Sequence, residues 1–164
     1  MDKSSWPPGP WHDEPDVWHG EASGYVCSIR RVPHSGHLCG YVTIPLSHPW
    51  YGLDYSDDAP TPPGLLESPV NIDKIGVLNL FCAPAPGSTI RLALCLPVHG
   101  GLTYAEAEDE DWTFGFDCAH AGDATPGHRP SGTYRTFAYV REEVESLARQ
   151  LRHFHSVADA LAGV

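Results

Sequence analysis

Two short segments of the chain hold a dense set of side chains that can take part in chemistry. The first, residues 98–104, is a glycine turn that carries His99. The second, residues 112–123, is an aromatic run that ends in acidic, thiol and imidazole groups. Together they bring two imidazoles, two carboxylates and one thiol close in sequence: His99, Asp117, Cys118, His120 and Asp123. This concentration indicates a functional site without naming its reaction.

A divalent metal is one interpretation of this set. Zinc accepts sulfur, nitrogen and oxygen ligands in four-coordinate sites, and an open position on the ion makes a bound water acidic enough to attack a phosphate ester. In this hypothesis the protein is a metal-dependent phosphohydrolase, and one carboxylate is its general base. The candidate ligands are His99, Asp117, Cys118, His120 and Asp123. Their spacing matches none of the standard zinc signatures.

A second interpretation makes Cys118 a nucleophile that an imidazole activates. His120 lies two residues further along the same predicted strand, a spacing that rarely gives the in-line hydrogen bond that activation requires. His99 is the better base if the glycine turn brings it near. The sequence has no recognised nucleophile motif around Cys118, which favours a binding protein over an enzyme.

A third interpretation is ligand binding without chemistry. The glycine turn lets backbone N–H groups face a phosphate, carboxylates can hold ribose hydroxyls, and aromatic rings can stack on a base. Arg135 or Arg141 can answer a phosphate. The alternative is an ordinary tight turn in which Asp123 bonds to its own loop. The predicted ligand-binding residues are His99, Gly100, Gly101, Thr103, Asp117, His120, Asp123, Trp50 and Tyr51, with Trp112 as a further stacking ring.

The chain has five cysteines, an odd number, and no CxxC pair. Cys27, His34, His37 and Cys39 form a second candidate zinc cluster around a predicted hairpin. In the alternative reading the cysteines are small core residues and the histidines are turn residues in water. The N-terminus shows no apolar leader, so we expect free thiols in a reducing cytoplasm.

The pattern of elements predicts an α+β fold, with a mainly antiparallel sheet and one C-terminal amphipathic helix packed on it. Residues 25–31 and 38–44 are β-rich and flank a turn, which predicts a hairpin. The other predicted strands cover 77–81, 90–96 and 112–118, and the acidic residues 106–111 are predicted to be a connector.

Apolar residues at 4, 3, 4, 3 spacing from Val140 to Phe154 predict the helix, and Thr136 is its predicted N-cap. Residues 1–24 are rich in tryptophan and proline and are predicted to be an extended arm, because proline opposes regular pairing. We expect its indoles to fill surface grooves. Residues 25–164 are predicted to be a single α+β domain.

The formal net charge of −11 limits the kinds of partner that the protein can bind. Without a basic footprint we expect no binding to duplex nucleic acid, and no apolar run approaches the roughly 20 residues that span a bilayer. The acidic surface and the arm suggest a further function, an inhibitor that occupies a basic host protein. The residues leave assembly into a homo-oligomer open.

Four stretches resemble, as a set, a family of small bacteriophage and prophage proteins: His48–Tyr55, Val98–Ala105, Phe114–Asp123 and Ala138–Leu151. The resemblance spans much of residues 25–151, without residues 56–97, and it implies no activity and no catalytic residue. What it implies is a setting in which small acidic proteins blunt host defence.

The main prediction is therefore a counter-defence protein in the cytoplasm of an infected bacterium, which sequesters a nucleotide-derived signal and needs no cofactor. A phosphohydrolase that uses zinc or another divalent metal, and an acidic inhibitor of a host protein, are the alternatives.

Overall fold

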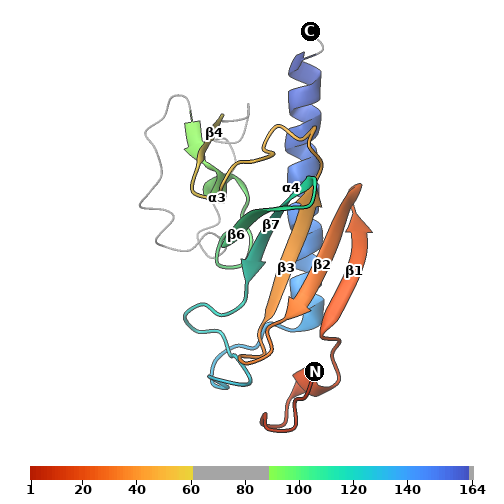
Figure 1. Ribbon diagram of the computed structural model, residues 1–164. Coiled ribbons are helices and arrows are strands. Elements are labelled where there is room, and N and C mark those ends of the chain that lie inside the picture. The colour runs from red at the N-terminus through yellow and green to blue at the C-terminus, as the bar shows by residue number, and fades with distance from the viewer. Residues whose placement is uncertain (61–88, 163–164) are drawn as a thin grey trace.

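The computed structural model describes residues 1–60 and 89–162 as a sheet with a helix packed on one face (Figure 1). The five strands are antiparallel, in the order β1-β2-β3-β7-β6. The predicted α+β class is confirmed. The strands are β1 (Val17–Ala22), β2 (Tyr25–Arg31), β3 (Leu38–Ile44), β6 (Tyr104–Glu108) and β7 (Asp111–Asp117), and the helix is α4 (Phe137–Ala162).

The predicted hairpin is confirmed with its predicted bounds as β2 and β3. Strand β7 starts one residue before the predicted aromatic strand and pairs along β3, from Cys39 opposite Asp117 to Ile44 opposite Trp112. Side chains alternate across a sheet, so Phe114 and Phe116 both face the helix layer and are buried.

Four short elements surround this framework. A 3-10 turn covers Pro10–His12, and β4 (Asp58–Pro60) pairs with β5 (Thr89–Arg91) in a separate two-stranded sheet. The helical turn α3 (Leu92–Cys95) follows β5 directly, so the strand predicted over 90–96 is wrong beyond residue 91. Leucine and alanine are good helix formers. The strand predicted over 77–81 lies outside the described residues.

The acidic connector predicted over 106–111 is also wrong, because its first half belongs to β6. Glu106 to Glu108 pair with Thr113 to Asp111 of β7. Only then does the chain turn, with Asp109 at a φ of 56°. An edge strand tolerates charge because its outer face and edge are solvated, and β6 still buries Ala105.

Helix α4 follows the predicted apolar stripe and continues through Ala162. The Thr136 hydroxyl accepts a hydrogen bond from the Tyr139 N–H at 3.2 Å, which confirms the predicted N-cap. The helix lies so close to the sheet that a methyl group on Gly40 would overlap Val144. No helix within 1–60 and 89–162 is long and apolar enough to cross a lipid bilayer.

The N-terminal arm packs on the domain as expected, but its last part is a strand. Trp6 and Trp11 are buried, and Trp6 lies against Gly36 in the hairpin turn. Residues 17–22 pair with β2 as the edge strand β1. Pro15 is the last proline of the arm, so the N–H groups after it are free to join a ladder.

The cysteines and histidines of the hairpin do not form the second candidate zinc cluster. Cys27 faces the core between the sheet and α4, and Cys39 lies on the other face of the sheet, three positions away in the hairpin register. Both are free thiols whose pKa burial raises to about 11. A hydrogen bond of 2.7 Å joins His37 Nδ1 to the Ser35 hydroxyl in the same turn, and His34 is exposed.

A buried arginine ties the arm to the helix. The side chain of Arg31 is fully buried and bonds to Glu14 at 3.1 Å, to Asp16 at 2.9 Å and to the Tyr134 hydroxyl at 2.8 Å. Glu14 also accepts a hydrogen bond from the Phe137 N–H at 2.9 Å and another from Tyr134. An anion at a helix N-terminus is stabilised by the orphan N–H groups and the helix dipole.

We predict that Glu14→Ala lowers the free energy of unfolding by roughly 2–3 kcal/mol, because it strips a buried arginine and a helix N-terminus of one carboxylate. The matched control is Asp13→Ala, which removes an exposed acid one position earlier and should cost less than about 0.5 kcal/mol. Urea denaturation followed by circular dichroism measures both. Equal stability of the two variants would contradict the proposed tie.

Candidate metal centre

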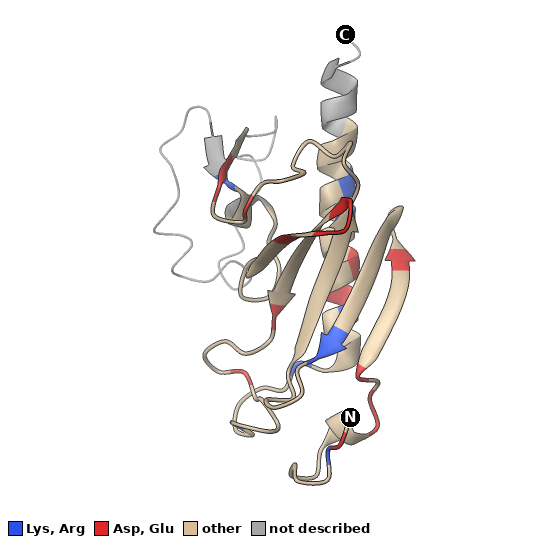
Figure 2. Cartoon of the chain, viewed as in Figure 1, with Lys and Arg blue, Asp and Glu red and all other residues tan. Residues whose placement is uncertain are grey.

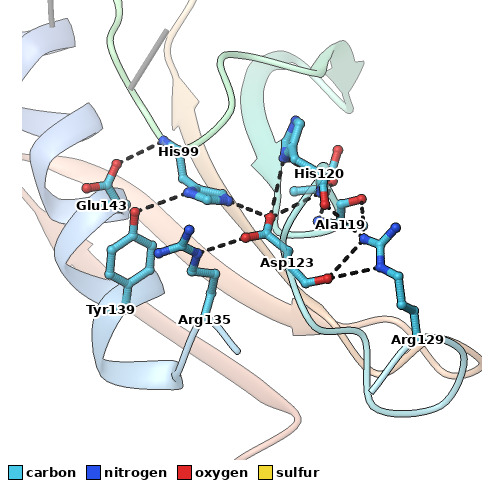
Figure 3. Close-up of polar contacts among 9 residues, drawn as sticks. His99, Ala119, His120, Asp123, Arg129, Arg135, Tyr139 and Glu143 are labelled. Atoms are coloured by element: carbon cyan, nitrogen blue, oxygen red, sulfur yellow. Dashed lines mark hydrogen bonds and ion pairs between the residues drawn. The ribbon is translucent and has the colours of Figure 1, made fainter. Parts of the chain in front are cut away.

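Three segments that are far apart in sequence meet beside the end of β7 (Figure 3). The glycine loop before β6 contributes His99, and the loop after β7 contributes His120 and Asp123. The first turns of α4 and the segment that leads into the helix contribute the rest of the cluster: Tyr139 and Glu143 from α4, and Arg135 from two residues before it. Of the residues that the sequence proposes for one site, the structure brings His99, His120 and Asp123 together.

The Asp123 carboxylate is the centre of the cluster and is 99% buried. Its Oδ2 accepts hydrogen bonds from His99 Nε2 at 2.7 Å and from the His120 backbone N–H at 3.1 Å. Its Oδ1 accepts a hydrogen bond from Arg135 Nε at 2.8 Å. Both oxygens of this buried charge are therefore satisfied, as a buried carboxylate requires.

The pKa of Asp123 is lowered from its ordinary value by the balance of these contacts. Burial alone raises the pKa, and it is the largest single effect. The hydrogen bonds and charges of His99 and Arg135 favour the ionised form and together outweigh it. Asp123 is thus a carboxylate at neutral pH.

Helix α4 holds His99 from the other side. The Tyr139 hydroxyl lies 3.1 Å from Nδ1, the ring nitrogen that faces away from Asp123. The carboxylate of Glu143, one turn further along the helix, accepts a hydrogen bond from the His99 backbone N–H at 2.9 Å. The imidazole is fixed at both nitrogens and at its backbone, so its Nε2 keeps one direction.

His120 faces the same carboxylate from the solvent side. Its ring lies 5.4 Å from that of His99, at 79° to it. Its Nδ1 is 3.8 Å from Asp123 Oδ2 and 3.8 Å from Asp117 Oδ1, beyond hydrogen-bond distance of both. Nδ1 is buried without a hydrogen-bond partner, although the side chain as a whole is 31% exposed.

The structure gives Gly100 and Gly101 roles other than the phosphate contact that the sequence suggested. Gly100 has a φ of 68°, and the His120 ring lies where its side chain would be. The close approach that glycine permits is therefore that of an imidazole of this chain. Gly101 N–H donates to the Val98 carbonyl at 3.0 Å, within an ordinary turn.

The other predicted residues of these segments lie at the margin or outside. Asp117 is one third exposed beside His120, and its Oδ1 accepts a hydrogen bond from the Ala119 N–H at 2.9 Å. Thr103 is exposed, and its backbone N–H donates a hydrogen bond to the Gly115 carbonyl at 2.9 Å. Cys118 points into the core, and burial raises its pKa well above its ordinary value, which opposes a metal-bound or nucleophilic thiolate.

The predicted aromatic wall is at the opposite end of the sheet. Trp50 is buried against Phe154 of α4, with ring centres 4.5 Å apart. Tyr51 lies beside Trp112, which begins β7, whereas Asp117 ends it. At about 3.4 Å per residue, five residues of strand separate these ends by roughly 17 Å. No ring of this set can stack on a ligand held by His99 and Asp123.

Sequence reasoning missed three members of the cluster. Glu143 lies on the apolar stripe of the helix, three residues after Val140 and one before Val144, and an acid at such a position signals a buried partner. Tyr139 neighbours the same stripe. Arg129 donates to the carbonyls of His120 and Asp123 at 2.8 and 2.9 Å and pins their loop. Nothing in the local sequence pattern distinguishes it.

Three ligand atoms of this cluster lie within 4.8 Å of one another: His99 Nε2 or Nδ1, one His120 ring nitrogen and one Asp123 oxygen. Zinc bonds to nitrogen and oxygen at about 2.0–2.2 Å, so an ion can contact all three after small side-chain movements.

The chain matches no protein-family model, and neither curated proteins nor solved structures give a match.

We predict that Gly100→Ala destabilises the protein by at least about 1–2 kcal/mol more than Gly24→Ala. Both positions have a positive φ, 68° and 80°, so both variants carry the cost of a left-handed alanine. Only the methyl group at position 100 also meets the His120 ring, and overpacking costs about 1–3 kcal/mol. Thermal unfolding measures the difference. Equal losses would show that His120 does not rest on Gly100.

The lowered pKa of Asp123 predicts an acid-labile contribution to stability. A carboxyl group whose pKa is lower in the folded than in the unfolded chain stabilises the fold above its unfolded pKa, and this stabilisation is lost as the pH falls through the folded value. The difference in unfolding free energy between the wild type and Asp123→Asn should be full above about pH 5 and should shrink below about pH 4. A constant difference would contradict the assignment.

Proposed function

We propose that the protein binds one divalent metal ion, of the nitrogen- and oxygen-preferring kind to which zinc belongs, and that it hydrolyses a phosphate ester. The ligands are His99 Nε2, His120 Nδ1 and Asp123 Oδ2. The observation that carries the proposal is the convergence of these atoms from two separate loops, the glycine loop before β6 and the loop after β7. A bound ion supplies an acidic water molecule as the nucleophile.

The outer contacts of the ligands support this assignment. A metal-binding histidine normally bonds through its second ring nitrogen to a group that fixes its orientation, and Tyr139 occupies that position on His99. The second oxygen of Asp123 is held by Arg135. These outer contacts fix the orientation of both residues. The atoms proposed to bind the ion, His99 Nε2 and Asp123 Oδ2, are the ones that face away from those contacts. Ion binding at His99 Nε2 would displace the proton that bonds to Asp123.

The ring nitrogen of His120 supports it further. Leaving a buried nitrogen unsatisfied costs about 1–3 kcal/mol, and Nδ1 has no hydrogen-bond partner between two carboxylates. An ion shared with Asp123 would satisfy it.

The exposed margin of the cluster offers the groups that a phosphate reaction needs. Asp117 is 32% exposed and close to His120, a suitable place for a fourth ligand or a general base. Arg135 is 30% exposed, and within the described part of the chain its Nη atoms have no hydrogen-bond partner. Such a guanidinium can bind phosphate oxygens while its Nε stays on Asp123.

Sequestration of a nucleotide-derived signal, the main expectation from sequence, is less well supported. The aromatic residues predicted to stack on a base, Trp50 and Tyr51, lie at the opposite end of the sheet. The backbone of Gly100 is covered by the His120 ring. In the counter-defence setting that the resemblance implies, this site favours cleavage of a phosphate-containing signal over its capture.

We predict that chelator-treated protein binds one Zn²⁺ per chain in calorimetry, and that His120→Ala weakens this binding by more than about 100-fold. Loss of an outer partner alone typically costs 10–100-fold, so loss of a ligand must cost more. The matched control is His128→Ala, an exposed histidine of the same loop, which should bind as the wild type does.

The same samples test the reaction with bis(p-nitrophenyl) phosphate as substrate. We expect hydrolysis only after Zn²⁺ or Mn²⁺ is added, and its loss in His120→Ala. A wild type that binds no ion would refute the metal centre, whereas ion binding without hydrolysis would refute the reaction alone.

A further inference from the structure

A concave surface lies at the far end of the sheet from the metal centre. It is an open hollow of about 690 Å³ between the start of the loop after β3 and the turn that joins β6 to β7. We call it the distal hollow. Its lining residues are Pro45, Leu46, Ser47, Tyr51, Glu110 and Asp111.

The two walls of the distal hollow are tied together. The Tyr51 hydroxyl donates a hydrogen bond to the Glu110 carbonyl at 3.2 Å. The Trp112 indole donates to the Leu53 carbonyl at 3.1 Å, and the rings of Tyr51 and Trp112 lie 6.0 Å apart. These contacts join the loop to the turn directly, so the hollow has a defined shape before any partner arrives.

One wall is apolar and open to solvent. Leu46 is 72% exposed, the most exposed large hydrophobic side chain among the described residues. Pro45 and Tyr51 also line this hollow. A single exposed leucine is ordinary on a protein surface. Here it stands at the rim of a concavity, where a partner side chain can cover it.

The opposite wall is strongly acidic. Residues 106–111 read Glu-Ala-Glu-Asp-Glu-Asp and contain no basic residue. Figure 2 shows these acids along β6 and its turn into β7. Glu110 and Asp111 are exposed where they line the hollow. Such a wall repels phosphates and nucleic acids and attracts cationic groups.

We propose that the distal hollow is a docking surface for a partner protein, and that it binds an arginine- or lysine-containing segment flanked by an apolar residue. The cationic group lies beside Glu110 and Asp111, near Tyr51, whose ring can add a cation–π contact to the attraction. The apolar neighbour covers Leu46. This function is independent of the metal centre, from which Tyr51 and Trp112 are separated by the length of β7.

The test uses the full-length protein labelled with ¹⁵N and the peptide acetyl-Leu-Arg-Arg-Leu-amide as the probe. Titration should shift the amide signals of Leu46, Ser47, Tyr51 and Glu110, and the uncharged peptide acetyl-Leu-Gln-Gln-Leu-amide should leave them unchanged. Glu110→Lys should weaken binding at least about tenfold, because it places a like charge opposite the arginine.

The matched control is Glu21→Lys, which makes the same change in net charge at an exposed position of β1 and should alter affinity less than about twofold. Leu46→Ser keeps the charges, removes no buried contact and should weaken binding several-fold. Equal weakening by Glu110→Lys and Glu21→Lys would reduce the effect to net charge and overturn the proposal. Shifts confined to other residues, or none at millimolar peptide, would also overturn it.

Discussion

The burial of one carboxylate, that of Asp123, sets the arrangement of the whole candidate site. A buried charge is tolerated only where hydrogen bonds and opposite charge replace water. Asp123 obtains them from the glycine loop through His99, from its own loop through the His120 N–H, and from the approach to α4 through Arg135. Three segments that share no local structure are thereby held at one point, and the two imidazoles that flank the carboxylate are positioned as a consequence.

The fold was predictable where side-chain periodicity is strong. The hairpin, the aromatic strand and the amphipathic helix with its Thr136 cap each carry a local pattern, and each is confirmed. The two edge strands were missed, because prolines precede β1 and acids fill β6, and neither is typical of a strand. Edge strands bury few side chains, so they tolerate both a preceding proline and a run of acidic residues. The turn α3 replaced a predicted strand because a short run of leucine and alanine carries no period.

The candidate site was predictable in its residue types and less so in its extent. His99, His120 and Asp123 meet as the density of polar groups suggested, because the acidic hairpin between their segments returns the chain to the same edge. Trp50 and Tyr51 were misplaced, since sequence proximity to a histidine says nothing about which end of a strand a loop occupies. The contributions of Tyr139 and Glu143 depend on tertiary contact with α4, although an acid within the apolar stripe gave a usable signal for Glu143.

The two ends of the sheet differ in character: one gathers nitrogen and oxygen ligands around a buried charge, and the other presents an acidic, partly apolar hollow.

The most direct test of the metal centre is a crystal structure of the protein grown with Zn²⁺, with anomalous scattering measured at the zinc edge. The account predicts one strong peak about 2.0–2.2 Å from His99 Nε2, His120 Nδ1 and Asp123 Oδ2, with the direct bond between His99 and Asp123 opened. A map without a peak there, in which His99 Nε2 and Asp123 Oδ2 keep their separation of 2.7 Å, would contradict it.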